Sequence, residues 1–108
     1  MKLEDKIDIS ILNTVYGSLL TPHQREMIRL YYDCDISLFE ISEQFGVSRQ
    51  AVRDSLVRAE KALNTYEDKM QLVSKNKQII KILSDANNSN DINEIKSSIK
   101  KAIDKLEE

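Results

Sequence analysis

Residues that cross-link, kink or interrupt a chain are scarce in this sequence. Its 108 residues include two glycines, one proline, one cysteine and no tryptophan. With so few glycines and prolines, tight turns are rare and most of the chain is free to be helical. Cys34 has no second cysteine for an internal disulfide, and one histidine, His23, gives no metal-ligand spacing. We therefore expect neither a metal site nor a cofactor.

Long apolar runs are absent too. No stretch approaches the roughly 20 apolar residues of a membrane span. The start, MKLEDKIDIS, carries acidic residues where a secretory signal peptide needs an apolar run. By elimination, we expect a cytoplasmic protein with no membrane partner.

Catalytic patterns are also missing. Gly17 and Gly46 lie too far apart to form a phosphate-binding glycine loop. No serine or carboxylate pattern around His23 suggests a triad, and Glu40 with Glu43 reads as solvated helix surface. We expect that the protein is not an enzyme.

The charges are unevenly distributed, although the net charge is only −2. Residues 1–47 carry four basic and eight acidic side chains, and residues 62–108 carry eight of each. Residues 48–61 carry four basic and two acidic side chains. Positive charge is therefore concentrated on one short segment, which is more informative about partners than the total.

Helical spacing of apolar residues predicts an all-α fold. Residues 5–19 place Ile9, Leu12, Tyr16 and Leu19 on one helix face. A second helix starts at a Thr21–Gln24 capping box, with Pro22 at its first position. Its stripe is Met27, Leu30, Tyr31 and Cys34, and the polar residues 33–36 end it.

Residues 37–61, SLFEISEQFGVSRQAVRDSLVRAEK, have the order of a helix-turn-helix. Ser37 with Glu40 forms a capping box, and Leu38, Ile41 and Phe45 form the buried face of a short helix. Gly46 suits the left-handed conformation that ends a helix. Val47 is expected to plug the turn, and Ser48 to cap the next helix, whose inward residues are Val52, Leu56, Ala59 and Leu63.

The outward residues of that second helix are the candidate nucleic-acid-binding residues. Arginine can grip guanine through two hydrogen bonds, and glutamine can do the same with adenine. Near the helix start the outward positions are Arg49, Gln50, Arg53 and Asp54. Ser48, Arg58 and Lys61 are expected to meet backbone phosphates, with Arg25 and Arg29 as weaker candidates.

The apolar stripe continues through Tyr66, Met70, Val73 and Ile80. It predicts either one long helix over residues 49–80 or two helices joined at Thr65. Residues 86–90 form the clearest linker, and Asp91 with Glu94 caps a last helix with an apolar seam of Ile92, Ile95, Ile99, Ile103 and Leu106. We therefore expect a domain over residues 1–63 and a helical extension over residues 64–108, which packs as an intrachain hairpin, forms a homodimer, or does both.

The stretch from Leu20 to Leu63 resembles region four of bacterial sigma factors, the domain that reads the promoter −35 element. The matching features are the LT-x-x-Q-R-E entry, the LYY that ends the second helix, S-x-x-E-I-S, and G-V-S-R-x-x-V-R. The whole chain, through its length, acidic first helix, G-V-S-R-Q-A-V core and helical tail, resembles the YlxM family of small proteins. That resemblance implies a gene neighbourhood shared with the signal recognition particle GTPase and its receptor.

Three functions follow from these features. The first is DNA binding by a transcriptional regulator, which Arg49, Gln50 and Arg53 favour. The second is an accessory factor that binds the signal recognition particle's RNA or GTPase, as the resemblance implies. The third is a protein–protein adaptor that has lost DNA contact. Asp54 favours the second and third, because many sigma factors carry glutamine at that position and a carboxylate repels phosphate.

Overall fold

The computed structural model describes the backbone of residues 3–108 and the side chains of residues 8–108. Within that range every regular element is a helix or a helical turn, so the expected all-α class is confirmed. The chain divides into two compact units, Met1–Met70 and Gln71–Glu108. The whole of the predicted helix-turn-helix, residues 37–61, belongs to the first.

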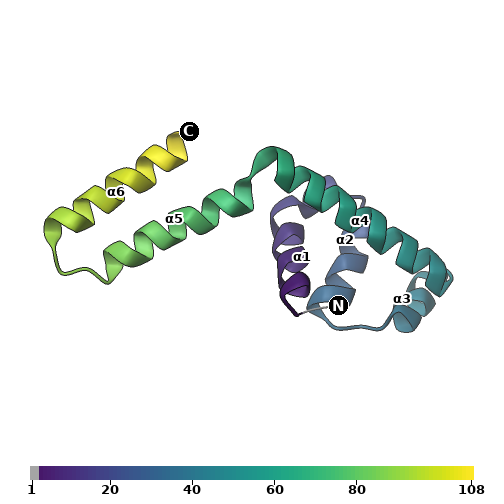
Figure 1. The fold of residues 1–108 in the computed structure, drawn as a ribbon. Helices are drawn as coiled ribbons and strands as arrows, with labels where there is room; N and C mark the ends of the chain where they lie inside the picture. Colours follow the sequence, from purple (N-terminus) through teal and green to yellow (C-terminus); the bar gives the residue numbers. More distant parts are fainter. Residues whose placement is uncertain (1–2) are drawn as a thin grey trace. The chain divides into compact units, whose positions relative to one another are not determined.

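The first unit groups three helices along a fourth. Its elements are α1 (Leu3–Tyr16), the 3₁₀ turn η1 (Gly17–Leu19), α2 (Pro22–Ile28), the π-helical turn η2 (Arg29–Asp33), α3 (Leu38–Phe45) and α4 (Arg49–Met70). Helices α1, α2 and α3 all pack against α4. Figure 1 shows them along one side of it, with α3 beside its N-terminal end.

The buried face of α4 is the centre of the core. It consists of the four predicted residues, which are at most 4% exposed: Val52, Leu56, Ala59 and Leu63. The largest fully buried side chains of the other three helices are Tyr16, Ile28 and Ile41. One apolar stripe on α4 therefore serves as the common packing surface for three helices.

Two tyrosines fix the second half of α4. The hydroxyl of Tyr16 donates a hydrogen bond to Oε1 of Glu67 over 2.6 Å, and the Tyr16 and Tyr66 ring centroids lie 6.1 Å apart. The hydroxyl of Tyr32, at the end of η2, donates to the Glu60 carboxylate. Because Tyr66 and Glu67 follow the last residue of the predicted motif, Lys61, the helix is anchored beyond the motif as well as at Glu60.

The predicted helix starts are largely confirmed. Thr21 and Gln24 form a reciprocal capping box, with both hydrogen bonds at 3.2 Å and Pro22 at the first helical position. Ser37 accepts from the Glu40 N–H over 3.1 Å. The structure gives no return bond from the Glu40 side chain, so this start has only half of the predicted box.

Two short turns change the register of the core, and two core predictions are wrong as a result. The tighter 3₁₀ turn η1 leaves Leu19 54% exposed and buries Leu20 instead. The wider π turn η2, in which the Cys34 N–H bonds to the Arg29 carbonyl, buries Tyr32 instead of Tyr31. A third core prediction is wrong at the end of this turn, because Cys34, expected to be half-buried on the same stripe, is exposed.

The joint in the long apolar stripe lies at Gln71. This residue adopts a left-handed conformation with φ of 56° between α4 and α5 (Leu72–Asn87). The hydroxyl of Thr65 donates to the Lys61 carbonyl within α4, so Thr65 starts no helix. Both sequence-based alternatives, a single helix over 49–80 and a joint at Thr65, are therefore wrong.

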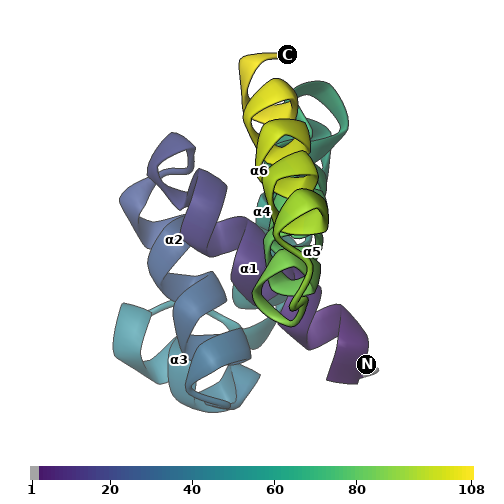
Figure 2. The same ribbon diagram turned by 90° about the vertical axis from the view of Figure 1, so that its left-hand side faces the viewer.

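The second unit is the expected intrachain hairpin. α5 and α6 (Ile92–Glu107) pack side by side and antiparallel (Figure 1, and from the loop end in Figure 2). α5 extends to Asn87, so the connection is shorter than the predicted linker 86–90. Asp91 caps α6 by accepting from the Asn93 N–H at 2.9 Å, while Glu94 accepts from the Ser89 hydroxyl.

The turn between α3 and α4 depends on Gly46. Its φ of 66° lies in the left-handed region, and its N–H bonds back to the Glu43 carbonyl. The N–H of Val47 bonds to the Ser42 carbonyl over 3.0 Å, so the end of α3 is closed by two backbone bonds. Val47 itself is 43% exposed, so the expected apolar plug is wrong: the backbone closes the turn, and the side chain does not.

Replacing Gly46 with alanine should lower the free energy of unfolding by about 1–2 kcal/mol, the usual cost of a left-handed alanine. No atom lies within 4 Å of the added methyl group, so the cost is purely conformational. Gly46→Asn, which tolerates this conformation better, should cost less. Urea denaturation measures both. Equal losses for the two variants would contradict the conformational explanation.

Candidate nucleic-acid interface

The helix-turn-helix is braced from both sides of its turn. Ile41 on α3 and Val52 on α4 are both fully buried, and α3 packs on α4. The ring of His23, at the start of α2, lies edge-on to Phe45 at the end of α3, with centroids 5.4 Å apart. These contacts fix the angle at which α4 leaves the turn.

The start of α4 is capped as predicted. The Ser48 hydroxyl oxygen accepts a hydrogen bond from the Ala51 N–H over 3.0 Å. Ser48 and the next two residues are exposed, so the first turn of the helix lies at the surface. Free N–H groups and the positive end of the helix dipole at such a start favour phosphate oxygens.

Three of the predicted base-reading residues lie together. Arg49, Gln50 and Arg53 are exposed and, with Leu38 of α3, line one hollow of about 230 Å³. Because Arg53 is four residues after Arg49, the two guanidinium groups lie on neighbouring turns of the same helix face. The first turns of α4 thus present two cations and one amide from a rigid, well-packed helix.

Asp54 is engaged with its neighbour. Its Oδ1 accepts a hydrogen bond from Nε2 of Gln50 over 2.9 Å, and both side chains are exposed. The bond holds the Gln50 amide against α4 and places a negative charge among the cations. A nucleobase that pairs with Gln50 must compete with this contact.

Arg58 and Lys61 are brought together further along α4. Both line a second hollow of about 310 Å³ with Ala62, Thr65 and Tyr66. Lys61 lies eight residues beyond Arg53, a rise of about 12 Å along the helix axis. This separation suits contacts to phosphates outside the groove that the first turns would enter.

Sequence reasoning missed Val57. It is 56% exposed, between the two groups of cations on the outward face of α4. An apolar side chain there is suited to contact with a thymine methyl group. The sequence contained a signal for its exposure, because Val57 directly follows Leu56 and lies outside the apolar stripe of the helix.

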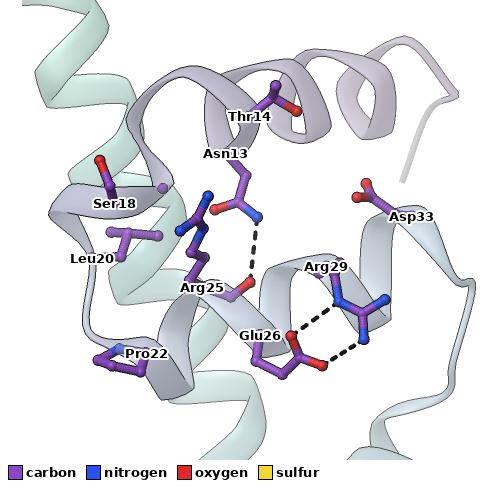
Figure 3. A pocket seen from close by; sticks show the side chains of 10 residues that line it. Asn13, Thr14, Ser18, Leu20, Pro22, Arg25, Glu26, Arg29 and Asp33 are labelled. Atoms are coloured by element: carbon purple, nitrogen blue, oxygen red, sulfur yellow. Dashed lines mark hydrogen bonds and ion pairs between the residues drawn. The ribbon is translucent and has the colours of Figure 1, made fainter.

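The two arginines of the second helix differ in availability. Arg29 donates two hydrogen bonds to the Glu26 carboxylate, at 2.5 and 3.0 Å (Figure 3), and these lower the pKa of Glu26. It donates a third to the Cys34 sulfur. Arg25 lines a pocket of about 620 Å³ between α1 and α2, next to the buried Asn13, whose Nδ2 donates to the Arg25 carbonyl. Arg25 makes no ion pair within the described residues, so it is the better phosphate candidate.

No cluster of three or more histidine, cysteine, aspartate or glutamate side chains suited to a metal ion occurs among the described residues. A search of the same residues for a helix long and apolar enough to cross a membrane finds none.

The fold and the capped, exposed start of α4 define a helix-turn-helix protein. Residues 3–105 match the model of the UPF0122 family, described as "Putative helix-turn-helix protein, YlxM / p13 like". The chain belongs to this family.

The curated relatives agree with this assignment. A UPF0122 protein of Clostridium novyi is 42% identical over 104 residues, which cover 90% of each chain. One from Desulforamulus reducens is 56% identical over 75 residues, which are 69% of this chain and 64% of the relative, less than two thirds of its length. One from Oceanobacillus iheyensis is 48% identical over 81 residues, 75% of this chain and 77% of the relative.

Replacing Ser48 with alanine should lower the free energy of unfolding by about 0.5–2 kcal/mol, because the Ala51 N–H loses its cap. Ser48→Asp keeps a capping oxygen and should preserve the stability. Thermal unfolding followed by circular dichroism measures both. If Ser48→Ala and Ser48→Asp were equally stable, the cap would contribute nothing here.

Proposed function

We propose that this chain is a non-catalytic nucleic-acid-binding protein that acts as a regulatory or accessory factor in the cytoplasm. The observation that carries the proposal is the exposed cluster of Arg49, Gln50 and Arg53 on the capped start of α4. Cations and an amide at the start of a braced second helix match the way helix-turn-helix proteins read a major groove.

In this proposal the face of α4 divides into two regions. Arg49, Gln50, Arg53 and Val57 meet base edges, and Arg58 with Lys61 meets phosphates. Ser48 and Arg25 add phosphate contacts at the entry to the helix. Residues 48–61 carry only a small net positive charge, and residues 1–47 carry more acidic than basic side chains. Both limit binding that is independent of nucleotide sequence, since non-specific affinity comes mainly from neutralised phosphates.

The finer assignment is to the signal recognition particle pathway, through that particle's RNA or its GTPase. It is supported by the gene neighbourhood that the resemblance to YlxM proteins implies, and the matching family model names YlxM in its description. Incubation of the purified chain with the particle's RNA and, separately, with its GTPase tests it. Failure to bind either would leave a stand-alone transcriptional regulator as the proposal.

One observation favours a second candidate, a protein–protein adaptor. The Asp54 carboxylate holds the Gln50 amide and carries a negative charge on the face that would meet the phosphates. In an adaptor, this pair would bind a protein surface instead. Capture of the GTPase by a chain that binds neither DNA nor RNA would establish this alternative.

Arg49→Ala and Arg53→Ala should each weaken binding by about 1–3 kcal/mol where they meet base edges. The ligand is a duplex selected from a random-sequence pool, and fluorescence anisotropy gives the affinity. Lys69→Ala is the matched control, because it removes an exposed cation from the last turn of the same helix. Lys61→Ala should reduce the salt dependence by about 0.9 in the log–log slope, the contribution of one phosphate contact.

Equal effects of Arg49→Ala and Lys69→Ala would contradict a recognition role for the start of α4. Circular dichroism should show unchanged folding in all four variants, since every replaced side chain is exposed.

Asp54→Ala should strengthen binding to nucleic acid, because it removes a negative charge and frees the Gln50 amide. The gain should be about threefold to tenfold at low salt and should shrink as salt screens the charge. Asp68→Ala, which removes an exposed carboxylate from the far end of α4, is the control. A loss of affinity on Asp54→Ala would show instead that the carboxylate itself contacts a base, as an acceptor from cytosine.

A further inference from the structure

The second unit is too small to be stable through its own core. Gln71–Glu108 is a two-helix hairpin, and units of less than about 40 residues usually need disulfides, metals or oligomerisation. The only cysteine, Cys34, lies in the other unit. No metal-binding cluster occurs in the part of the chain that the structure describes. Of these three means of stabilisation, oligomerisation remains.

The seam between α5 and α6 is thin. The buried residues of its two helices are Val73, Ile79, Ala86 and Ala102, at 4–9% exposure, and two of these four are alanines. Ile82 and Ile95 are only half-buried. The hairpin therefore encloses little apolar surface between its helices.

Most of the large apolar side chains of the hairpin lie outside this seam. Six of them are 44–66% exposed: Ile80, Leu83, Ile92, Ile99, Ile103 and Leu106. Several follow a seam residue directly in the sequence, as Ile80 follows Ile79, Leu83 follows Ile82, and Ile103 follows Ala102. One residue is a rotation of about 100° around an α-helix.

These side chains face the same side of the hairpin. On each helix the exposed residues come about one residue after the seam residues, so they are offset from the seam by the same angle and in the same direction around the helix. Because α5 and α6 are antiparallel and share the seam, this equal offset places both sets of side chains on one side of the hairpin. We call this surface of six side chains the hairpin face.

The hairpin face is large enough for an interface. With each side chain about half exposed, it presents on the order of 600 Å² of apolar surface, the upper end of what monomers expose in one patch. A standard interface buries roughly 800 Å² per partner, and polar residues around the apolar surface supply the area that the six side chains do not. The area therefore matches that needed for a stable dimer.

The charged residues of α6 that border the hairpin face, on the side away from α5, are complementary to those of a second copy of the helix. Lys96 lies one turn after Ile92 and Lys100 directly follows Ile99, whereas Glu107 lies one turn after Ile103. All three are exposed and make no ion pair within the described residues. The edge is basic in the first half of the helix and acidic in the second, so two α6 helices in antiparallel contact place lysine against glutamate twice.

We propose that the hairpin face binds the same face of a second copy of this chain, with the two α6 helices antiparallel across a two-fold axis and α5 flanking them. The result is a four-helix bundle that joins two helix-turn-helix units. A two-fold interface of this kind brings identical surfaces together, and the distribution of lysine and glutamate on α6 is self-complementary in that orientation. The proposal stands on the second unit alone and does not depend on nucleic-acid binding.

Sedimentation velocity of the full chain at about 10 μM should give a mass near 25 kDa, twice the 12.5 kDa of the chain. Ile99→Asp should raise the dissociation constant of the dimer at least about tenfold, because it places a charge at the centre of the apolar surface. Ser97→Asp, an exposed change on the other side of α6, is the matched control and should leave the mass unchanged.

Charge reversal tests the partner and its orientation without disturbing the apolar packing. Lys96→Glu alone and Glu107→Lys alone each create two like-charged pairs per dimer and should weaken association roughly tenfold. An equimolar mixture of the two variants restores both pairs and should associate as well as the original chain. This rescue is expected only if Lys96 of one copy faces Glu107 of the other.

A 12.5 kDa species for the unmodified chain at 10 μM would overturn the proposal. The hairpin face would then be covered by the chain's own first unit or by another protein. A dimer that Ile99→Asp leaves intact, or a mixture of charge variants that fails to recover, would overturn the assigned surface or its orientation.

Discussion

The burial of one apolar stripe on α4 is the interaction on which the rest of the first unit depends. Val52, Leu56, Ala59 and Leu63 are at most 4% exposed, and α1, α2 and α3 all pack against their helix. The same helix carries the candidate base-reading residues on its opposite side. Core packing therefore fixes the orientation of Arg49 and Arg53, because a rigid helix cannot turn one face without turning the other.

The proposed binding site and the proposed dimer surface expose opposite kinds of side chain. The start of α4 exposes polar side chains on a helix whose buried face is complete. The hairpin exposes apolar side chains on helices whose seam is thin, with alanine at two of its four buried positions. A complete core allows the first surface to be polar and specific, whereas an incomplete core gives the second surface a reason to associate. Joining two units would present two recognition helices to neighbouring half-sites.

Several features could be predicted from the sequence because they depend on neighbours in the chain. Capping oxygens at Thr21, Ser37 and Ser48, the left-handed Gly46 and the apolar stripe of α4 are set by local sequence, and the structure confirms them. The positions of Leu19 and Cys34 were predicted wrongly because η1 and η2 depart from 3.6 residues per turn. The break at Gln71 had no signal either, since glutamine rarely adopts a left-handed conformation.

The all-α class, the helix-turn-helix and the family resemblance follow from the sequence, because periodicity, caps and the glycine turn are properties of short segments. Which apolar residues remain exposed depends on how the helices pack. Ile92, Ile99 and Leu106 form as regular a stripe as the residues of α4, yet they lie at the surface. A stripe specifies that a face is apolar. Whether that face is covered depends on how many helices pack on it: within the first unit three pack on α4, and within the second one packs on α6.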